Sequence, residues 1–418
     1  MLRIPRSQAV APAVRVPEPR AHRRVNDAST AWSPAFGYAL RLWRRDADAA
    51  AAAAIDASAF ARTLAQHRLA LALPAADTLD AGVPEALRAA LRTRQRRMTM
   101  HALRQTAALR GIVASLRAAG LRHCLLKGQG YAALFDARQR EACDIDLLVV
   151  REECGRALPL LRELGYVPDP AAAADPERYA NDNHALPLRH ATTGVVLELH
   201  LRLANQPGQF RLTGPALWNE HTTTVTLAGL QVTTLAPPAA VVYAAFHGTK
   251  HNWHRAFWLV DMAQAMRSAT LDWGAALALA RGLGIERQLA MGVLLAEATL
   301  GAALPPALRA QAPLLRSARR AADALLPHLD ALGSDRGADL AARLGMVRYA
   351  LRLLSLQSTW RGRLQLIPFL LAPTQDDRSA VALPGHLHWA YPGLRALRLA
   401  RQHLAKRRHA RRERPQRG

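Results

Sequence analysis

The chain has 418 residues, half of them hydrophobic and 5% aromatic, and its formal net charge of +24 indicates anionic partners such as nucleotides, nucleic acid or a membrane surface. Part of this charge lies in basic ends, which are usually solvated tails. No stretch approaches the ~18 uncharged apolar residues of a membrane span, and three cysteines without CxxC spacing exclude a zinc ribbon or a disulfide framework.

The N-terminal part is predicted to be a tail followed by helices. Residues 1–33 combine Pro, Arg and small residues without periodicity, and they lack the apolar segment of a secretory signal. We therefore expect a disordered basic tail on a cytoplasmic protein. Residues 34–120 show helical periodicity, interrupted by turn signals near Pro74 and Gly82, and the last helix is expected over His101–Ala119.

Between residues 121 and 236, short apolar strands alternate with helices, which predicts a small mixed sheet. The expected strands are His123–Leu126, Asp144–Val150, His184–Arg189, Val195–Leu203, Thr223–Leu227 and Gln231–Leu235, with helices at Gly128–Phe135 and Glu152–Leu164. Residues 237–405 are again helical, starting at a Pro-Pro pair that suits a first turn, and 406–418 form a second basic tail. The prediction is an α+β fold with a sheet core at 121–236 and helical regions on both sides.

Two carboxylates stand out in the strand that begins at Asp144. Asp144 and Asp146 point to one face because side chains alternate along a strand, while Ile145 points to the other. A carboxylate left unpaired in such an apolar strand costs several kcal/mol. We therefore expect both to be paired, hydrogen-bonded or bound to a metal.

A later strand offers matching polar residues. Glu198, His200 and Arg202 alternate with apolar residues and share one face. Three carboxylates that converge on one face suit a hard cation such as Mg²⁺, which binds oxygen ligands and substrate phosphates together. The alternative is a polar, solvent-facing sheet edge on which Glu198 pairs with Arg202.

Lysine is rare in this Arg-rich chain. The three lysines are Lys127, Lys250 and Lys406, and the last lies in the basic tail. A compact ammonium is not equivalent to the planar guanidinium fork, so Lys127 and Lys250 indicate positions that require a point charge. Chance retention is the alternative.

The segment AFHGTKHNWHRAFWLVD places histidines and aromatic residues close together. On a continuous helix, His247, His251 and His254 would share one face. That face suits a wall of a nucleotide cleft, with Trp253 and Trp258 as stacking surfaces. A helix-packing surface and a zinc site are the alternatives, and aromatic residues of this kind more often belong to a core.

Several of these motifs together resemble a known family. LLKG, then Arg140, then DIDLLV, followed by ELHLRL, is similar to an uncharacterised bacterial nucleotidyltransferase family of the polymerase-β-type nucleotidyltransferase superfamily, often associated with peptide and polysaccharide biosynthesis clusters. The likeness extends from about residue 36 to 400. One departure is the turn Lys127-Gly128-Gln129, where the superfamily usually has Gly-Ser or Gly-Gly.

The resemblance implies an enzyme that moves a nucleoside monophosphate from an NTP such as ATP to an acceptor hydroxyl and releases pyrophosphate. It implies two Mg²⁺ ions, with Asp144, Asp146 and Glu198 as both the metal ligands and the catalytic residues. The residues expected to bind the nucleotide are Lys127, Gly128, Gln129, Arg140, His200, Lys250 and His251.

The acceptor stays open at this point. A small molecule or peptide is the first expectation. The excess of Arg favours a tRNA- or polynucleotide-modifying enzyme, whereas the altered turn favours a non-catalytic, nucleotide-binding scaffold of a biosynthetic cluster. The sequence indicates no obligate protein partner and no membrane span.

Overall fold

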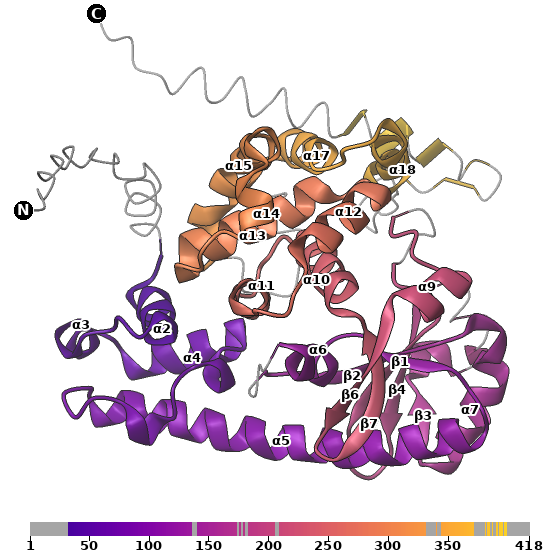
Figure 1. Cartoon of the computed structure of the whole chain (residues 1–418), viewed down its shortest axis with the longest axis horizontal. Coiled ribbons are helices and arrows are strands. Elements are labelled where there is room, and N and C mark those ends of the chain that lie inside the picture. Colours follow the sequence, from indigo (N-terminus) through magenta and orange to yellow (C-terminus); the bar gives the residue numbers. More distant parts are fainter. Residues whose placement is uncertain are drawn as a thin grey trace, which may run out of the picture.

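The computed structural model of the chain contains a seven-stranded mixed sheet with the order β3-β4-β5-β2-β1-β7-β6, which lies at the lower right in Figure 1. The structure describes residues 32–371, except for 136–139, 174, 177–178, 180–182, 205–208, 332–339 and 341–343, together with some residues between 381 and 398. The predicted tails 1–33 and 406–418 therefore lie almost wholly outside the described residues. The strands are β1 (His123–Leu125), β2 (Asp144–Val149), β3 (Tyr166–Pro168), β4 (Ala185–His190), β5 (Val196–His200), β6 (Thr222–Leu227) and β7 (Leu230–Leu235).

Helices pack against both faces of this sheet, and most of the C-terminal helices lie above it in Figure 1. Those that precede it are α2 (Pro34–Arg44), α3 (Ala49–Ala53), α4 (Ala57–His67) and α5 (Glu85–Ala118). Those inserted between strands are α6 (Gln129–Leu134), α7 (Cys154–Glu163) and α9 (Gly214–Glu220). Those that follow are α10 (Pro237–Lys250), α11 (Phe257–Arg267), α12 (Trp273–Leu283), α13 (Glu286–Leu300), α14 (Pro306–Arg309), α15 (Ala312–Leu325), α17 (Met346–Ser355) and α18 (Trp360–Leu371). The α+β prediction is confirmed.

The strand pairing is mixed. β2 runs parallel to β5, and β1 runs parallel to β7, whereas the other neighbouring pairs are antiparallel. The predicted hairpins at 184–203 and 223–235 are both present, as β4–β5 and β6–β7. The short strand β3 and the helix α9 were not predicted, because three and seven residues carry too little periodicity to stand out.

The helix expected over His101–Ala119 is the second half of a longer one. α5 has 34 residues and begins directly after Pro84, at its N-cap. A helix of this length extends about 50 Å, and in Figure 1 it runs along one whole side of the molecule. No proline interrupts residues 85–118, so nothing in the sequence stops the helix before the turn at Gly120.

The two faces of the sheet pack against different partners. Ile145 and Leu147 belong to an apolar cluster that includes Ile112 of α5 and Leu158 of α7. On the opposite face, Leu148 belongs to a larger cluster with residues of α10, α11 and α13. β2 therefore has a uniformly apolar face toward α5 and α7, while the face that carries its aspartates turns toward the C-terminal helices. No helix in the described part of the chain is long and apolar enough to cross a membrane.

Candidate active site

The predicted carboxylates lie on one face of the sheet, on two neighbouring parallel strands. Asp146 of β2 lies beside Glu198 of β5, and Asp144 lies beside Val196. The alternation of side chains places all three carboxylates on the face that turns toward α10. Because β5 has β4 on one side and β2 on the other, these residues do not lie on a sheet edge.

Asp146 is the most buried of the three carboxylates, with a side chain 4% exposed. Its Oδ1 atom lies 2.7 Å from Lys127 Nζ and 3.0 Å from His200 Nε2. Burial by itself would raise the pKa of Asp146, but the charge of Lys127 and the hydrogen bond from His200 hold that pKa well below its usual range. Burial likewise opposes the charge of Lys127, but Asp146 raises the lysine pKa above its ordinary value. At neutral pH the two side chains therefore form an ion pair.

His200 connects Asp146 to Glu198. Its Nε2 lies 3.3 Å from Glu198 Oε2, while the His200 side chain is 1% exposed and that of Glu198 is 35% exposed. One donor atom each from Asp146, Glu198 and His200 lie within 4.8 Å of one another, close enough to hold one cation. Two carboxylates and an imidazole are donors suited to a divalent metal. The residues at this position therefore fit a divalent metal ion.

Asp144 lies two residues before Asp146 and outside that group of three donors. Burial raises its pKa to about 6, and the charges of Asp146 and Glu198 add to this effect. Within the described residues, no side chain forms a hydrogen bond or an ion pair with its carboxylate. Asp144 is thus a half-buried carboxyl group near the negative charges of Asp146 and Glu198, and a bound metal cation would be stabilised there.

The turn after β1 brings Lys127 over the carboxylates. Gly128 has φ 59° and ψ −121°, and a Cβ on it would lie 3.3 Å from the Cβ of Ala142. Glycine suits this position because a side chain would be strained by both the backbone and the contact. Gln129 turns away from the carboxylates: its Nε2 donates to the Ala102 carbonyl of α5 at 3.2 Å. Of the three turn residues, only Lys127 contacts the acidic cluster.

Arg140, expected to bind the nucleotide, pairs with a carboxylate of the C-terminal helices. Its Nε lies 2.9 Å from both carboxylate oxygens of Asp261 in α11, and its guanidinium carbon lies 4.8 Å from the ring centroid of Phe257. Burial raises the pKa of Asp261, and the charge of Arg140 opposes that rise. Tyr131 Oη of α6 also donates to the Asp261 backbone carbonyl, at 3.0 Å. Arg140 therefore ties the sheet core to the C-terminal helices.

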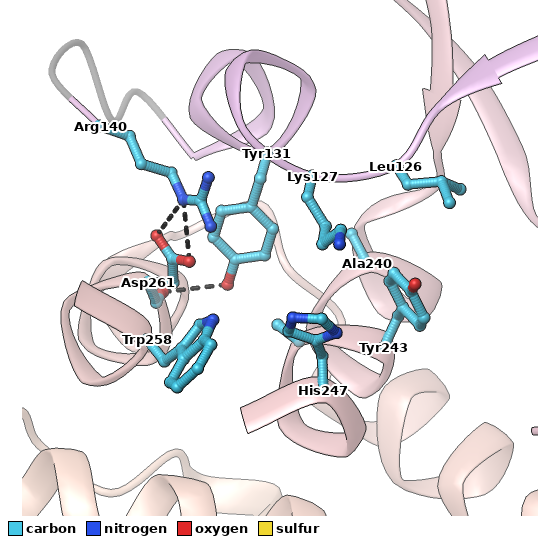
Figure 2. Close-up of a pocket in the computed structure, with 10 residues that line it drawn as sticks. Leu126, Lys127, Tyr131, Arg140, Ala240, Tyr243, His247, Trp258 and Asp261 are labelled. Carbon is cyan, nitrogen blue, oxygen red and sulfur yellow. Dashed lines mark hydrogen bonds and ion pairs between the residues drawn. The ribbon is translucent and has the colours of Figure 1, made fainter. Parts of the chain in front are cut away.

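Figure 2 shows a small cavity between the turn after β1 and helices α10 and α11. Its volume is about 10 Å³, roughly that needed for one water molecule. The lining residues are Leu126, Lys127, Tyr131, Arg140, Ala240, Tyr243, Ala244, His247, Trp258 and Asp261. Lys127 belongs to both this cavity and the acidic cluster, so the cavity adjoins the carboxylates.

The histidine segment does not form the continuous helix that we expected, because α10 ends at Lys250. His251 instead stacks on Trp258, with ring centroids 5.3 Å apart, and His254 meets the same indole edge-on at 4.9 Å. Burial is the main cause of the lowered pKa values, about 3 for His251 and about 8 for Lys250, and neighbouring lysines add to it. His251 is therefore neutral at physiological pH.

Trp253, considered above as a stacking surface, is a core residue. It is fully buried, and an added Cβ at Gly248 or Gly292 would lie 2.8 or 2.7 Å from its ring. Helices α10 and α13 can therefore pack closely against the indole, because each has a glycine at the point of contact. Trp258, by contrast, lines the cavity (Figure 2).

Sequence reasoning missed three residues that line the cavity, namely Tyr131, Tyr243 and Asp261. A carboxylate directly after the apolar Trp258-Leu259-Val260 was the available signal for Asp261, by the same argument that identified Asp144. The two tyrosines lie in ordinary helical patterns, and the sequence offers no signal for their position.

A comparison with protein families gives one match. Residues 53–301 match the model of a family described as uncharacterised nucleotidyltransferase. No curated protein and no solved structure matches the chain. The matched range includes every residue of this candidate site.

Proposed function

Because the chain belongs to the uncharacterised nucleotidyltransferase family, we propose that it transfers a nucleoside monophosphate from an NTP to a hydroxyl of a small molecule or peptide, with release of pyrophosphate. We assign it to the polymerase-β-type superfamily. The observation that carries the proposal is the register of β2 and β5, in which Asp146 lies beside Glu198 and two residues after Asp144, next to Lys127.

The carboxylates bind the metal in this proposal. Asp144, Asp146 and Glu198 would hold divalent metal, with two Mg²⁺ ions as the expectation from the resemblance. Metal held there would supply positive charge to the attacking and leaving oxygens of the transfer. Asp144 and Glu198 are more exposed than Asp146, so substrates approach from their side of the cluster.

The other residues of the site bind and orient. Lys127 supplies a positive charge next to Asp146, and Gly128 lets the backbone approach a phosphate closely. Lys250 and His251 add polar groups at the end of α10. Arg140 would add positive charge near the phosphates, and its pair with Asp261 holds it beside Lys127 in the cavity. Positioning and charge stabilisation are the main tasks of a protein in phosphoryl transfer, so these residue types suit it.

One observation favours a second candidate, a polynucleotide acceptor. α5 carries eight arginines and a single glutamate. Arg96, Arg97 and Arg104 are exposed, and no described residue pairs with them. A row of exposed guanidinium groups suits a phosphate backbone, and binding of RNA would then weaken steeply with salt.

The test is to incubate the purified protein with each of the four α-labelled NTPs and a divalent metal. Pyrophosphate release is measured, and label is followed into protein, RNA and small-molecule pools. Asp146→Asn and Glu198→Gln should abolish release. Glu163→Gln is the matched control, because Glu163 is exposed on α7 at the opposite face of the sheet. Absence of metal-dependent release with every NTP would reject the enzymatic proposal in favour of a nucleotide-binding scaffold.

A further inference from the structure

The donors gathered around Asp146 are not all oxygen atoms. A nitrogen, His200 Nε2, faces both Asp146 and Glu198 at 3.0 and 3.3 Å. Carboxylate and water oxygens suit Mg²⁺, whereas imidazole nitrogen is a ligand of first-row transition metals. The composition of the site therefore bears on which ion it selects.

The separations between these atoms match those of ligands around a single ion. Two atoms each about 2.1 Å from a metal lie about 3.0 Å apart at an octahedral angle and about 3.4 Å apart at a tetrahedral one. The observed His200 separations, 3.0 Å to Asp146 and 3.3 Å to Glu198, lie within this interval. Lys127 Nζ contacts the same Asp146 oxygen at 2.7 Å, so a cation at the centre of the three would have to displace this ammonium from Asp146.

The imidazole is held in this direction by its surroundings. His200 ends β5, two residues after Glu198 and on the same face, and its side chain is 1% exposed. The ring of His184 lies edge-on against it, with centroids 5.4 Å apart. In this structure Nε2 faces two acceptor carboxylates and therefore carries a ring proton. A metal bound at Nε2 would leave the ring proton on Nδ1, which has no hydrogen-bond partner within the described residues.

We propose that Asp146, Glu198 and His200 form a mixed carboxylate–imidazole site that binds Mn²⁺ in preference to Mg²⁺. The proposal rests on the proposed function, because it concerns the same metal position, and it changes the expected ion. Mn²⁺ accepts both carboxylate oxygen and imidazole nitrogen, whereas Mg²⁺ gains little from the nitrogen.

The test measures binding without nucleotide or turnover. The full chain is freed of metal and titrated with Mn²⁺, with free Mn²⁺ followed by electron paramagnetic resonance, and Mg²⁺ is then added in competition. We expect Mn²⁺ to bind at least about tenfold more tightly than Mg²⁺. Pulsed spectra of bound Mn²⁺ should show the hyperfine coupling of a directly bound ¹⁴N.

Two variants test whether His200 supplies the nitrogen ligand of Mn²⁺. His200→Gln keeps a hydrogen-bond donor near Asp146 and should abolish the ¹⁴N coupling and lower Mn²⁺ affinity about tenfold or more, with a much smaller effect on Mg²⁺. His184→Ala, at the neighbouring ring, should leave the coupling in place.

Bound Mn²⁺ without ¹⁴N coupling, coupling that survives His200→Gln, or equal affinity for the two ions would each overturn the proposal. Failure of nucleotidyl transfer would not affect this result, because no step of the test depends on it. Conversely, an active enzyme whose bound Mn²⁺ shows no nitrogen ligand would keep the proposed function and remove His200 from the metal site.

Discussion

Substitution of Lys127 by Ala should destabilise the metal-free protein, because it leaves the Asp146 carboxylate buried without its main counter-charge. The Asp146 and Lys127 side chains are 4% and 16% exposed, and their charged atoms lie 2.7 Å apart. Removal of one partner from a buried pair costs about 3–5 kcal/mol. His200 still contacts Asp146 at 3.0 Å, and such a bond to a charged group contributes about 1.5–3 kcal/mol. We therefore expect a loss of about 2–3 kcal/mol at pH 7.

The assay is urea denaturation followed by circular dichroism, with a chelator present, for the wild type, Lys127→Ala, Asp146→Asn and the double variant. If Lys127 acts through Asp146, the loss should nearly vanish in the Asp146→Asn background, which removes the buried charge. Because the pKa of Asp146 is lowered in the folded state, the contribution of the pair exists above about pH 4 and disappears as the pH falls further. An equal loss in both backgrounds would refute this reasoning.

A divalent metal extends the same experiment. In Lys127→Ala, a cation bound at Asp146 replaces the missing positive charge, so added Mn²⁺ should stabilise the variant more than the wild type. NTP affinity then separates a phosphate-binding role of Lys127 from its pairing with Asp146. A role in phosphate binding predicts weaker NTP binding by about 1.5–3 kcal/mol, measured calorimetrically in the presence of metal. Lowered stability with unchanged NTP affinity would leave Lys127 as a partner of Asp146 only.

Three other substitutions test separate parts of the structure by urea denaturation. Asp144→Asn should stabilise the metal-free protein by about 1–2 kcal/mol above pH 6 and have little effect below pH 4. The reason is that the carboxyl pKa is raised to about 6 in the folded state, so ionisation of Asp144 destabilises that state as the pH rises. A stabilisation that does not change with pH would contradict this cause. Arg140→Met should cost about 3–5 kcal/mol and be partly rescued by Asp261→Asn, while a loss confined to NTP affinity would return Arg140 to the phosphates. Gly292→Ala should cost about 1–3 kcal/mol because its Cβ would lie 2.7 Å from Trp253, whereas Gly282→Ala, with no atom within 4 Å, should be neutral or stabilising.

The polar face of the site could be predicted from the sequence because it depends on local geometry. A period of two places Asp144 and Asp146 on one face of a strand, and Glu198 and His200 on one face of another. That β2 and β5 are neighbours could not be deduced in this way, since about 50 residues separate them and the order β4-β5-β2-β1 arises from tertiary packing. The family resemblance supplied the expectation that the two strands meet.

The partners of the buried charges could not be predicted. The sequence indicated that Lys127 supplies a point charge to the nucleotide, and the structure pairs it with Asp146. Arg140 and Asp261 are 121 residues apart, so no local pattern connects them. The end of α10 was missed for another reason. Asn252 and Trp253 adopt positive φ without a glycine or proline to indicate the break.

The large apolar cluster of the fold has a consequence for how this enzyme can be divided or recombined. Phe36 near the start of the described chain, Leu148 of β2 and Leu294 of α13 belong to the same cluster. A fragment cut to the strands alone would expose the surface that the two helical regions normally cover. We therefore expect that the strands with their acidic residues cannot be transferred to another protein without the helical regions. Successful chimeras of relatives would need to exchange the helical regions on both sides together with the strands.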